Sequence, residues 1–113
     1  RQRQMCIRDR YQAMPSTSGE DEPMMNVLVW KEQKNWIVCI FPRNKHRPSC
    51  YTAEGDTNIL ISPASVDMGG VFITPQEKDF EKITANDIAD ILGEVCLRPA
   101  AFRILIERIK QQL

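Results

Sequence analysis

The pattern of apolar residues changes along the chain from the spacing of strands to the spacing of helices. Four short apolar runs are rich in β-branched and aromatic residues and are separated by polar or turn-forming segments, as is typical of strands: residues 24–30, 36–41, 59–62 and 71–74. The polar segment between the first two runs is short enough for a hairpin. After residue 74, apolar residues recur at i, i+3, i+4 and i+7, the spacing of one helix face. The sequence therefore predicts an α+β fold, an antiparallel sheet of about four strands followed by C-terminal helices.

Threonine residues and a proline mark where these helices begin. Thr74 and Glu77 have the spacing of a capping box and predict a short first helix. Thr84 and Asp87 have the same spacing and start a second helix, which ends before Pro99, where a third begins. The apolar stripes of the second and third helices are Ile88, Ile91, Leu92 and Val95, then Phe102, Leu105, Ile106 and Ile109.

Length and charge limit the classes of function. A chain of 113 residues forms one domain at most. Its 15 basic and 15 acidic residues balance, so no overall field favours nucleic acid or an anionic membrane. No apolar run is long enough to span a bilayer. The four cysteines form no Cys-x-x-Cys pair, which argues against a zinc site and a disulfide framework. We expect a cytoplasmic protein with no metal and no cofactor.

The first residues do not resemble a natural beginning. Residues 1–10 lack an initiator methionine and show no periodicity, and they resemble adaptor-derived sequence at the ends of metagenomic reading frames. We interpret them as a non-native leader, and the alternative is a basic nucleic-acid arm. Residues 11–23 are then the end of a helix and a linker, and 24–113 form the folded part. If the leader is an artefact, the natural N-terminal part of the protein is missing.

A cluster of cations directly follows the second predicted strand. Arg43, Lys45 and Arg47 lie at the end of a buried run, and a rigid strand end with converging cations suits phosphate or carboxylate. The alternative is a solvated basic corner that pairs with acids of the linker. His46, the only histidine of the chain, is interpreted as a surface residue without a chemical role.

A second group of candidate ligand-binding residues surrounds a pair of glycines. Gly69 and Gly70 allow close approach of the backbone to a ligand or a positive φ, and Asp67 can accept a hydrogen bond from a sugar hydroxyl. A tight turn explains the same residues equally well. Asn26, early in the first strand, needs hydrogen-bond partners, which either a ligand or the backbone supplies.

The aromatic and acidic residues receive simpler interpretations. Tyr51 is the one aromatic residue placed to stack on a base beside the basic corner. Six further aromatic residues are expected in the core: Trp30, Trp36, Phe41, Phe72, Phe80 and Phe102. Glu77, Asp79 and Glu81 are expected to be acids of a helix start and of the surface.

Three segments together resemble a known superfamily: residues 25–30, 40–43 and 62–74. The chain from about residue 24 to the C-terminus is similar to the C-terminal part of histidine-triad-like nucleotide phosphorylases and transferases. It is nearest to an uncharacterised bacterial family of that superfamily, and more distantly it resembles GDP-hexose phosphorylases and diadenosine tetraphosphate phosphorylases. The order of residues shared with the GDP-hexose group is Pro63, Ala64, Asp67, Gly69 and Gly70.

The resemblance implies a partial histidine-triad-like fold and a reaction through a nucleotidyl-histidine intermediate. Those families place the nucleophile in a His-x-His-x-His or His-x-His-x-Gln strand, which this chain lacks. We therefore expect the catalytic strand to lie upstream, and this fragment to be inactive. Its expected role is to bind a nucleotide sugar or dinucleotide polyphosphate through Asn26, Arg43, Lys45, Arg47, Asp67, Gly69 and Gly70.

Two alternatives remain open at this point. The chain is either part of such an enzyme or a non-catalytic nucleotide-binding or assembly module of the same fold. A nucleic-acid binder that uses the basic corner is a third, weaker hypothesis. The partners expected are the nucleotide ligand, the N-terminal part of the same protein and, by analogy with related enzymes, a second copy in a homodimer.

Overall fold

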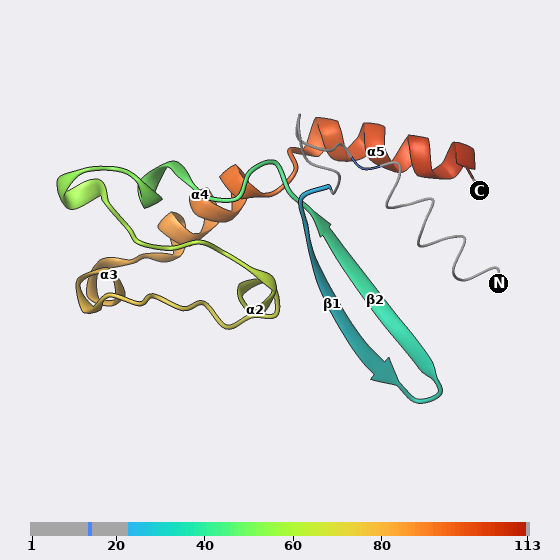
Figure 1. Ribbon diagram of the computed structural model, residues 1–113, viewed down its shortest axis with the longest axis horizontal. Coiled ribbons are helices and arrows are strands. Elements are labelled where there is room, and N and C mark those ends of the chain that lie inside the picture. The colour runs from blue at the N-terminus through green and yellow to red at the C-terminus, as the bar shows by residue number, and fades with distance from the viewer. Residues whose placement is uncertain (1–13, 15–22, 113) are drawn as a thin grey trace.

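The fold combines one hairpin with a C-terminal series of helices (Figure 1). The structure, a computed structural model, describes Met14 and residues 23–112, so the predicted leader and most of the predicted linker lie outside the described residues. Its elements are β1 (Met25–Glu32), β2 (Asn35–Pro42), short 3-10 turns at Ser49–Tyr51 and Gly55–Thr57, α2 (Ser65–Met68), α3 (Glu77–Lys82), α4 (Ala85–Val95) and α5 (Pro99–Gln112). The predicted α+β class, with antiparallel strands ahead of C-terminal helices, is confirmed.

The predicted hairpin forms between the first two apolar runs. β1 and β2 pair antiparallel, with Met25 opposite Pro42 and Glu32 opposite Asn35. A two-residue turn joins them, and Gln33 in that turn has a φ of 53°, the left-handed conformation that such tight hairpins require. Both strands are longer than the sequence pattern predicted, because polar residues next to the turn also join the ladder.

The third and fourth predicted strands are not confirmed: the part of the chain that the structure describes contains one sheet of two strands. Nearby carboxylates take the backbone donors that a ladder would use. Asp79 accepts a hydrogen bond from the Leu60 N–H at 2.8 Å, and Asp67 accepts one from the Ile73 N–H at 3.3 Å. Both segments are therefore extended but anchored by side chains, and they form no strand ladder.

The helix starts agree with the sequence at two of three positions. The capping box of α4 is confirmed, because Thr84 Oγ1 accepts from the Asp87 N–H at 3.2 Å and the Asp87 carboxylate accepts from the Thr84 N–H at 2.8 Å. The predicted break at Pro99 is also confirmed. The capping box expected at Thr74 is wrong: α3 begins only at Glu77, after an extended Gln76 that makes no side-chain cap.

The core consists of two small clusters joined at the end of β2. One contains Ile59, Ile61 and Ile91, and the other contains Met14 and Leu105. Between them the backbone after β2 is tied to the end of α4 and the start of α5. The bonds that join them are Asn44 N–H to Val95 O at 2.8 Å, Leu97 N–H to Pro42 O at 3.0 Å, and a bridge between Arg43 and Cys96. The basic corner predicted from the sequence therefore lies at the junction of the two clusters.

The expectation that the aromatic residues fill the core is wrong for four of them. Trp30 is 46% exposed, Trp36 is 64% exposed, and Phe80 and Phe102 are also exposed. The tryptophans lie near the turn of a hairpin that projects beyond the helices (Figure 1), where nothing in the described part of the chain covers them. Asp79, expected at the surface, is instead fully buried.

None of the helices that the structure describes has the length and apolar character needed to cross a bilayer.

The projecting hairpin leads to a prediction about self-association. A two-stranded sheet with exposed apolar side chains and free edges favours contacts between chains. We expect the chain to associate as its concentration rises. Trp36→Glu should reduce this association because it removes an exposed indole. The new acid lies opposite Lys31, a favourable cross-strand pair that should keep the hairpin intact. The measurement is the average mass in solution by light scattering. Ala100→Glu, an exposed position on α5, is the control; equal association of the two variants would contradict the prediction.

Candidate functional site

Arg43 is the centre of the basic corner and is buried, with 7% of its surface exposed. Its guanidinium donates five hydrogen bonds to four acceptors of the chain. Nη1 donates to Asn26 Oδ1 at 2.9 Å and to the Pro63 carbonyl. Nη2 donates to the Lys45 carbonyl at 3.1 Å and the His46 carbonyl at 2.6 Å, and Nε donates to the Lys45 carbonyl at 3.3 Å. Since an arginine has five N–H donors, Arg43 is fully occupied within the domain.

The burial of Arg43 changes its electrostatics without removing its charge. Desolvation lowers the pKa of the guanidinium, whereas Cys96 and Asp67 act in the opposite direction. An arginine begins from so high a pKa that it remains protonated. The buried charge therefore needs its acceptors, and it holds β1, the basic corner and the segment before α2 in fixed positions.

Lys45 is also paired within the domain. Its ammonium forms an ion pair with Glu94 on α4 and lies 3.4 Å from Ser49 Oγ. The Ser49 N–H donates to the same carboxylate at 2.9 Å. The hydrogen bonds from Lys45 and then from Ser49 lower the pKa of Glu94 to about 2, so the carboxylate stays charged at neutral pH. Lys45 therefore connects the corner to α4.

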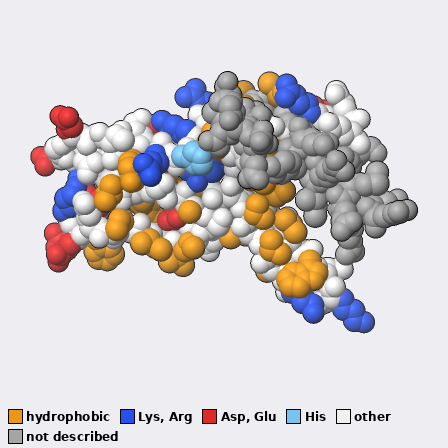
Figure 2. Space-filling model, viewed as in Figure 1, with side chains coloured by type: hydrophobic (Ala, Val, Ile, Leu, Met, Phe, Trp, Pro, Cys, Tyr) orange, Lys and Arg blue, Asp and Glu red, His pale blue; other side chains and the backbone are white. Residues whose placement is uncertain are grey.

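Arg47 is the exposed cation of the corner. Its guanidinium carbon lies 4.3 Å from the centre of the Tyr51 ring, a cation–π contact. Figure 2 shows the single histidine, His46, at the surface among basic side chains. Arg47 is therefore an exposed cation whose guanidinium lies above an aromatic ring.

The glycine pair forms the turn that follows α2. Asp67 closes this segment on itself, because its carboxylate accepts from the Ala64 N–H at 2.7 Å as well as from Ile73. Gly70 has a φ of 101°, which favours glycine. A Cβ on Gly69 would lie 3.2 Å from the Val66 carbonyl. These contacts match the turn interpretation of the two glycines.

The turn and the basic corner lie side by side. The Pro63 carbonyl, which Arg43 holds, is just ahead of α2, and Asn26 Nδ2 lies 3.5 Å from Ser65 Oγ at the start of that helix. The Leu28 side chain lies 3.8 Å from the position of a Cβ on Gly69. The structure therefore brings the predicted residues of the corner and of the turn into one region.

An open cavity of about 390 Å³ lies in this region. Tyr51 lines it, and so do Ser62, Asp67 and several apolar side chains of the two extended segments. Asp79 holds one wall in place through the Leu60 N–H, with the ammonium of Lys78 3.2 Å from its carboxylate. Desolvation raises the pKa of Asp79, but these partners together with Lys82 outweigh it and lower the pKa below its usual value.

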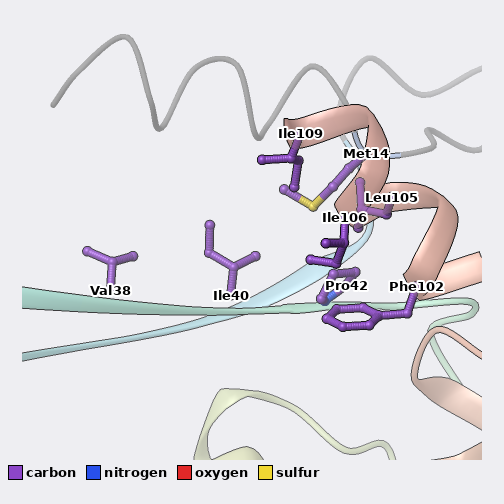
Figure 3. Close-up of a pocket in the computed structure, with 8 residues that line it drawn as sticks. All are labelled: Met14, Val38, Ile40, Pro42, Phe102, Leu105, Ile106 and Ile109. Carbon is purple, nitrogen blue, oxygen red and sulfur yellow. The ribbon is translucent and has the colours of Figure 1, made fainter. Parts of the chain in front are cut away.

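A second hollow lies between β2 and α5 and has a different character (Figure 3). Its volume is about 270 Å³, and every side chain that lines it is apolar, including Ile40, Phe102 and Leu105. It offers no side chain for acid–base or phosphate chemistry. In the part of the chain that the structure describes, no cluster of three His, Cys, Asp or Glu residues could hold a metal ion.

A family model for the GDPGP1-like C-terminal domain matches residues 19–113, which is most of the chain. The chain belongs to this family. Its similarity to the C-terminal part of a GDP-hexose phosphorylase-like protein, inferred above from three segments, is thereby confirmed. Comparison with curated proteins found no match, and comparison with solved structures found none either.

Sequence reasoning missed three residues that shape the site of this GDPGP1-like domain. The first two are Asp79 and Glu94, acids that hold the cavity wall and Lys45. Their sequence signal was weak, since both lie in helices rich in charge. The third is Arg43, whose structural role was missed. The neighbouring apolar strand indicated that Arg43 is anchored, but not that all its N–H donors are used within the domain.

Replacing Arg43 tests its structural role. Arg43→Ala removes hydrogen bonds from a charged donor and leaves the buried Pro63 carbonyl unpaired, so we expect a loss of roughly 2–4 kcal/mol in the free energy of unfolding. Arg43→Lys recovers little of it, because an ammonium cannot reproduce the planar fork. Denaturant unfolding measures both. Arg108→Ala, at an exposed position of α5, is the control; a similar small change in all three variants would contradict the role.

Proposed function

We propose that this domain forms one wall of the nucleotide-binding site of a nucleotide-sugar phosphorylase or nucleotidyltransferase, and that it does not supply the reacting histidine. The supporting observation is that Arg43 holds the segment ahead of the turn against the cationic corner, and that the cavity beside them is lined by Asp67 of the turn and by Tyr51, which lies under Arg47. Membership of the GDPGP1-like family favours a nucleotide sugar over a dinucleotide polyphosphate as the ligand.

The residues of this wall have different roles in the proposal. Arg47 is exposed and contacts the phosphates of the ligand directly, since none of the described residues forms a hydrogen bond or ion pair with its guanidinium, which suits the bidentate contacts that phosphate favours. Arg43 and Asn26 position the wall through their mutual hydrogen bond. Lys45 adds positive charge from its place beside Glu94, and its ammonium has donors left for a phosphate oxygen.

The turn at the glycine pair supplies the other part of the wall. Asp67 accepts from a hydroxyl or N–H of the ligand, because a carboxylate has more lone pairs than its two backbone donors use. Gly69 and Gly70 are exposed, and the absence of side chains there lets the ligand approach the backbone.

The chemistry itself requires a histidine from elsewhere in the protein. His46 is the only histidine of the chain, and it matches no position of a histidine-triad motif. In this proposal the N-terminal part of the protein supplies the nucleophile and covers the projecting hairpin. Pairing of two copies through their sheets is a further proposal that rests on analogy with related enzymes.

A second candidate function is a non-catalytic nucleotide-binding or assembly module. The observation in its favour is that all five donors of Arg43 already have partners in the domain. Recovery of the full reading frame separates the two: a His-x-His-x-His or His-x-His-x-Gln strand upstream supports the enzyme, and its absence supports the module.

Binding of GDP-glucose to the chain tests the proposed wall. Arg47→Ala should weaken binding about tenfold, the loss of one charge-assisted contact, and leave the melting temperature nearly unchanged. Arg108→Ala should bind like the parent. The dissociation constants come from NMR titration, and addition of phosphate should give no rapid release of GDP. Equal affinity of the Arg47 variant and the parent would contradict the proposed contact, and rapid GDP release would contradict the need for an external histidine.

A further inference from the structure

The cavity beside Tyr51 has walls that fit a flat ring better than a sugar. Five of the eight residues that line it have small or large apolar side chains: Leu60, Ala64, Val66, Ile73 and Pro75. Val66 is 53% exposed and Ile73 is 57% exposed, so apolar surface faces solvent at a concave place. A hexose carries hydroxyl groups around its ring and would leave many of them unpaired against such walls. The two faces of a heteroaromatic ring lose few hydrogen bonds to water when the ring enters such a cavity.

Few polar side chains line the cavity, and one of them, Asp67, carries a charged acceptor. Asp67 uses one oxygen for the Ala64 N–H and the other for the Ile73 N–H, and each keeps a lone pair for a further donor. Ser62 adds an exposed hydroxyl. A carboxylate beside apolar walls favours a ligand ring with N–H donors on its edge and disfavours one that presents only acceptors.

Tyr51 connects this cavity to the exposed cation. Its ring lines the cavity and also lies under the Arg47 guanidinium, at 4.3 Å from ring centre to guanidinium carbon. A ligand that fills the cavity therefore meets aromatic surface inside and a positive charge at the neighbouring position. This is the arrangement that a base joined to phosphates requires.

We infer that this cavity is the nucleobase subsite of the domain: it takes a base whose edge carries N–H donors, while the phosphates extend towards Arg47. The volume of about 390 Å³ lies within the range of small-molecule sites, about 300–1,000 Å³. The inference rests on the proposed function, because it assigns one part of the nucleotide to one part of the same wall.

Three ligands separate the parts of a nucleotide sugar in an NMR titration of the chain. GDP has the base without the hexose, glucose 1-phosphate has the hexose without the base, and GDP-glucose has both. We expect GDP and GDP-glucose to shift the backbone amide signals of Leu60, Val66 and Ile73 alike, and glucose 1-phosphate to leave them unchanged. Shifts produced by glucose 1-phosphate at these amides would overturn the base assignment.

The same titration distinguishes failure of the inference from failure of the proposed function. If GDP-glucose binds and shifts only amides far from the cavity, the subsite is wrong but nucleotide binding stands. If none of the three ligands binds, both are wrong.

A pair of variants tests the aromatic wall. Tyr51→Leu should weaken GDP binding about tenfold, in the range of base stacking on an aromatic side chain, and leave glucose 1-phosphate unaffected. Phe80→Leu, which alters an exposed aromatic residue of α3 that does not line the cavity, should bind GDP like the parent. Amide spectra of both variants show whether the fold is retained. Equal GDP affinity of the two folded variants would overturn the role of Tyr51.

Discussion

A buried arginine is costly unless every donor finds an acceptor, and Arg43 meets this condition with groups from three parts of the chain. Asn26 comes from β1, the carbonyls of Lys45 and His46 come from the corner, and the Pro63 carbonyl comes from the segment before α2. Asn26 adds a contact of its own with Ser65 Oγ at the start of α2, at 3.5 Å, and is itself held by Arg43. The position of the turn at residues 67–70 relative to the hairpin therefore depends on this guanidinium.

As a consequence, Arg43, Lys45 and Arg47 have different roles although they are close in sequence. Arg43 builds the corner, Lys45 joins it to Glu94 on α4, and Arg47 remains exposed over Tyr51. In the proposed phosphate site, Arg43 would fix the backbone and Arg47 would make the bidentate contact that a guanidinium favours. Carboxylates have a parallel role, since Asp67 and Asp79 hold the two extended segments that form the cavity walls.

The parts of the fold that depend on neighbouring residues were predictable. The hairpin follows from two apolar runs and a short polar link, and the start of α4 follows from Thr84 and Asp87 alone. The predicted third strand does not form because Asp79, which lies 19 residues away, holds Leu60, and the predicted fourth does not form because Asp67 holds Ile73. Propensity in an apolar run does not show that a distant carboxylate will take its backbone donors.

The residues that the sequence singled out lie near one another in the structure, but their contacts were less predictable. The sequence indicated a rigid cationic strand end and a turn with two glycines, and the structure brings them together. It did not indicate that Arg43 would be saturated, because its partners lie up to 20 residues away. The exposure of the tryptophans has a similar origin: an apolar alternation shows that a strand has an apolar face, but not what covers that face.

The most direct test of this account is the NMR spectrum of the arginine side chains of the intact chain. A guanidinium that donates five internal hydrogen bonds cannot rotate or exchange freely, so we predict separate, slowly exchanging Nη proton signals for Arg43. Arg108, exposed on α5, should give one averaged signal under the same conditions. If Arg43 gives an averaged, rapidly exchanging signal like that of Arg108, the guanidinium does not hold the corner and the turn together, and the central claim is wrong.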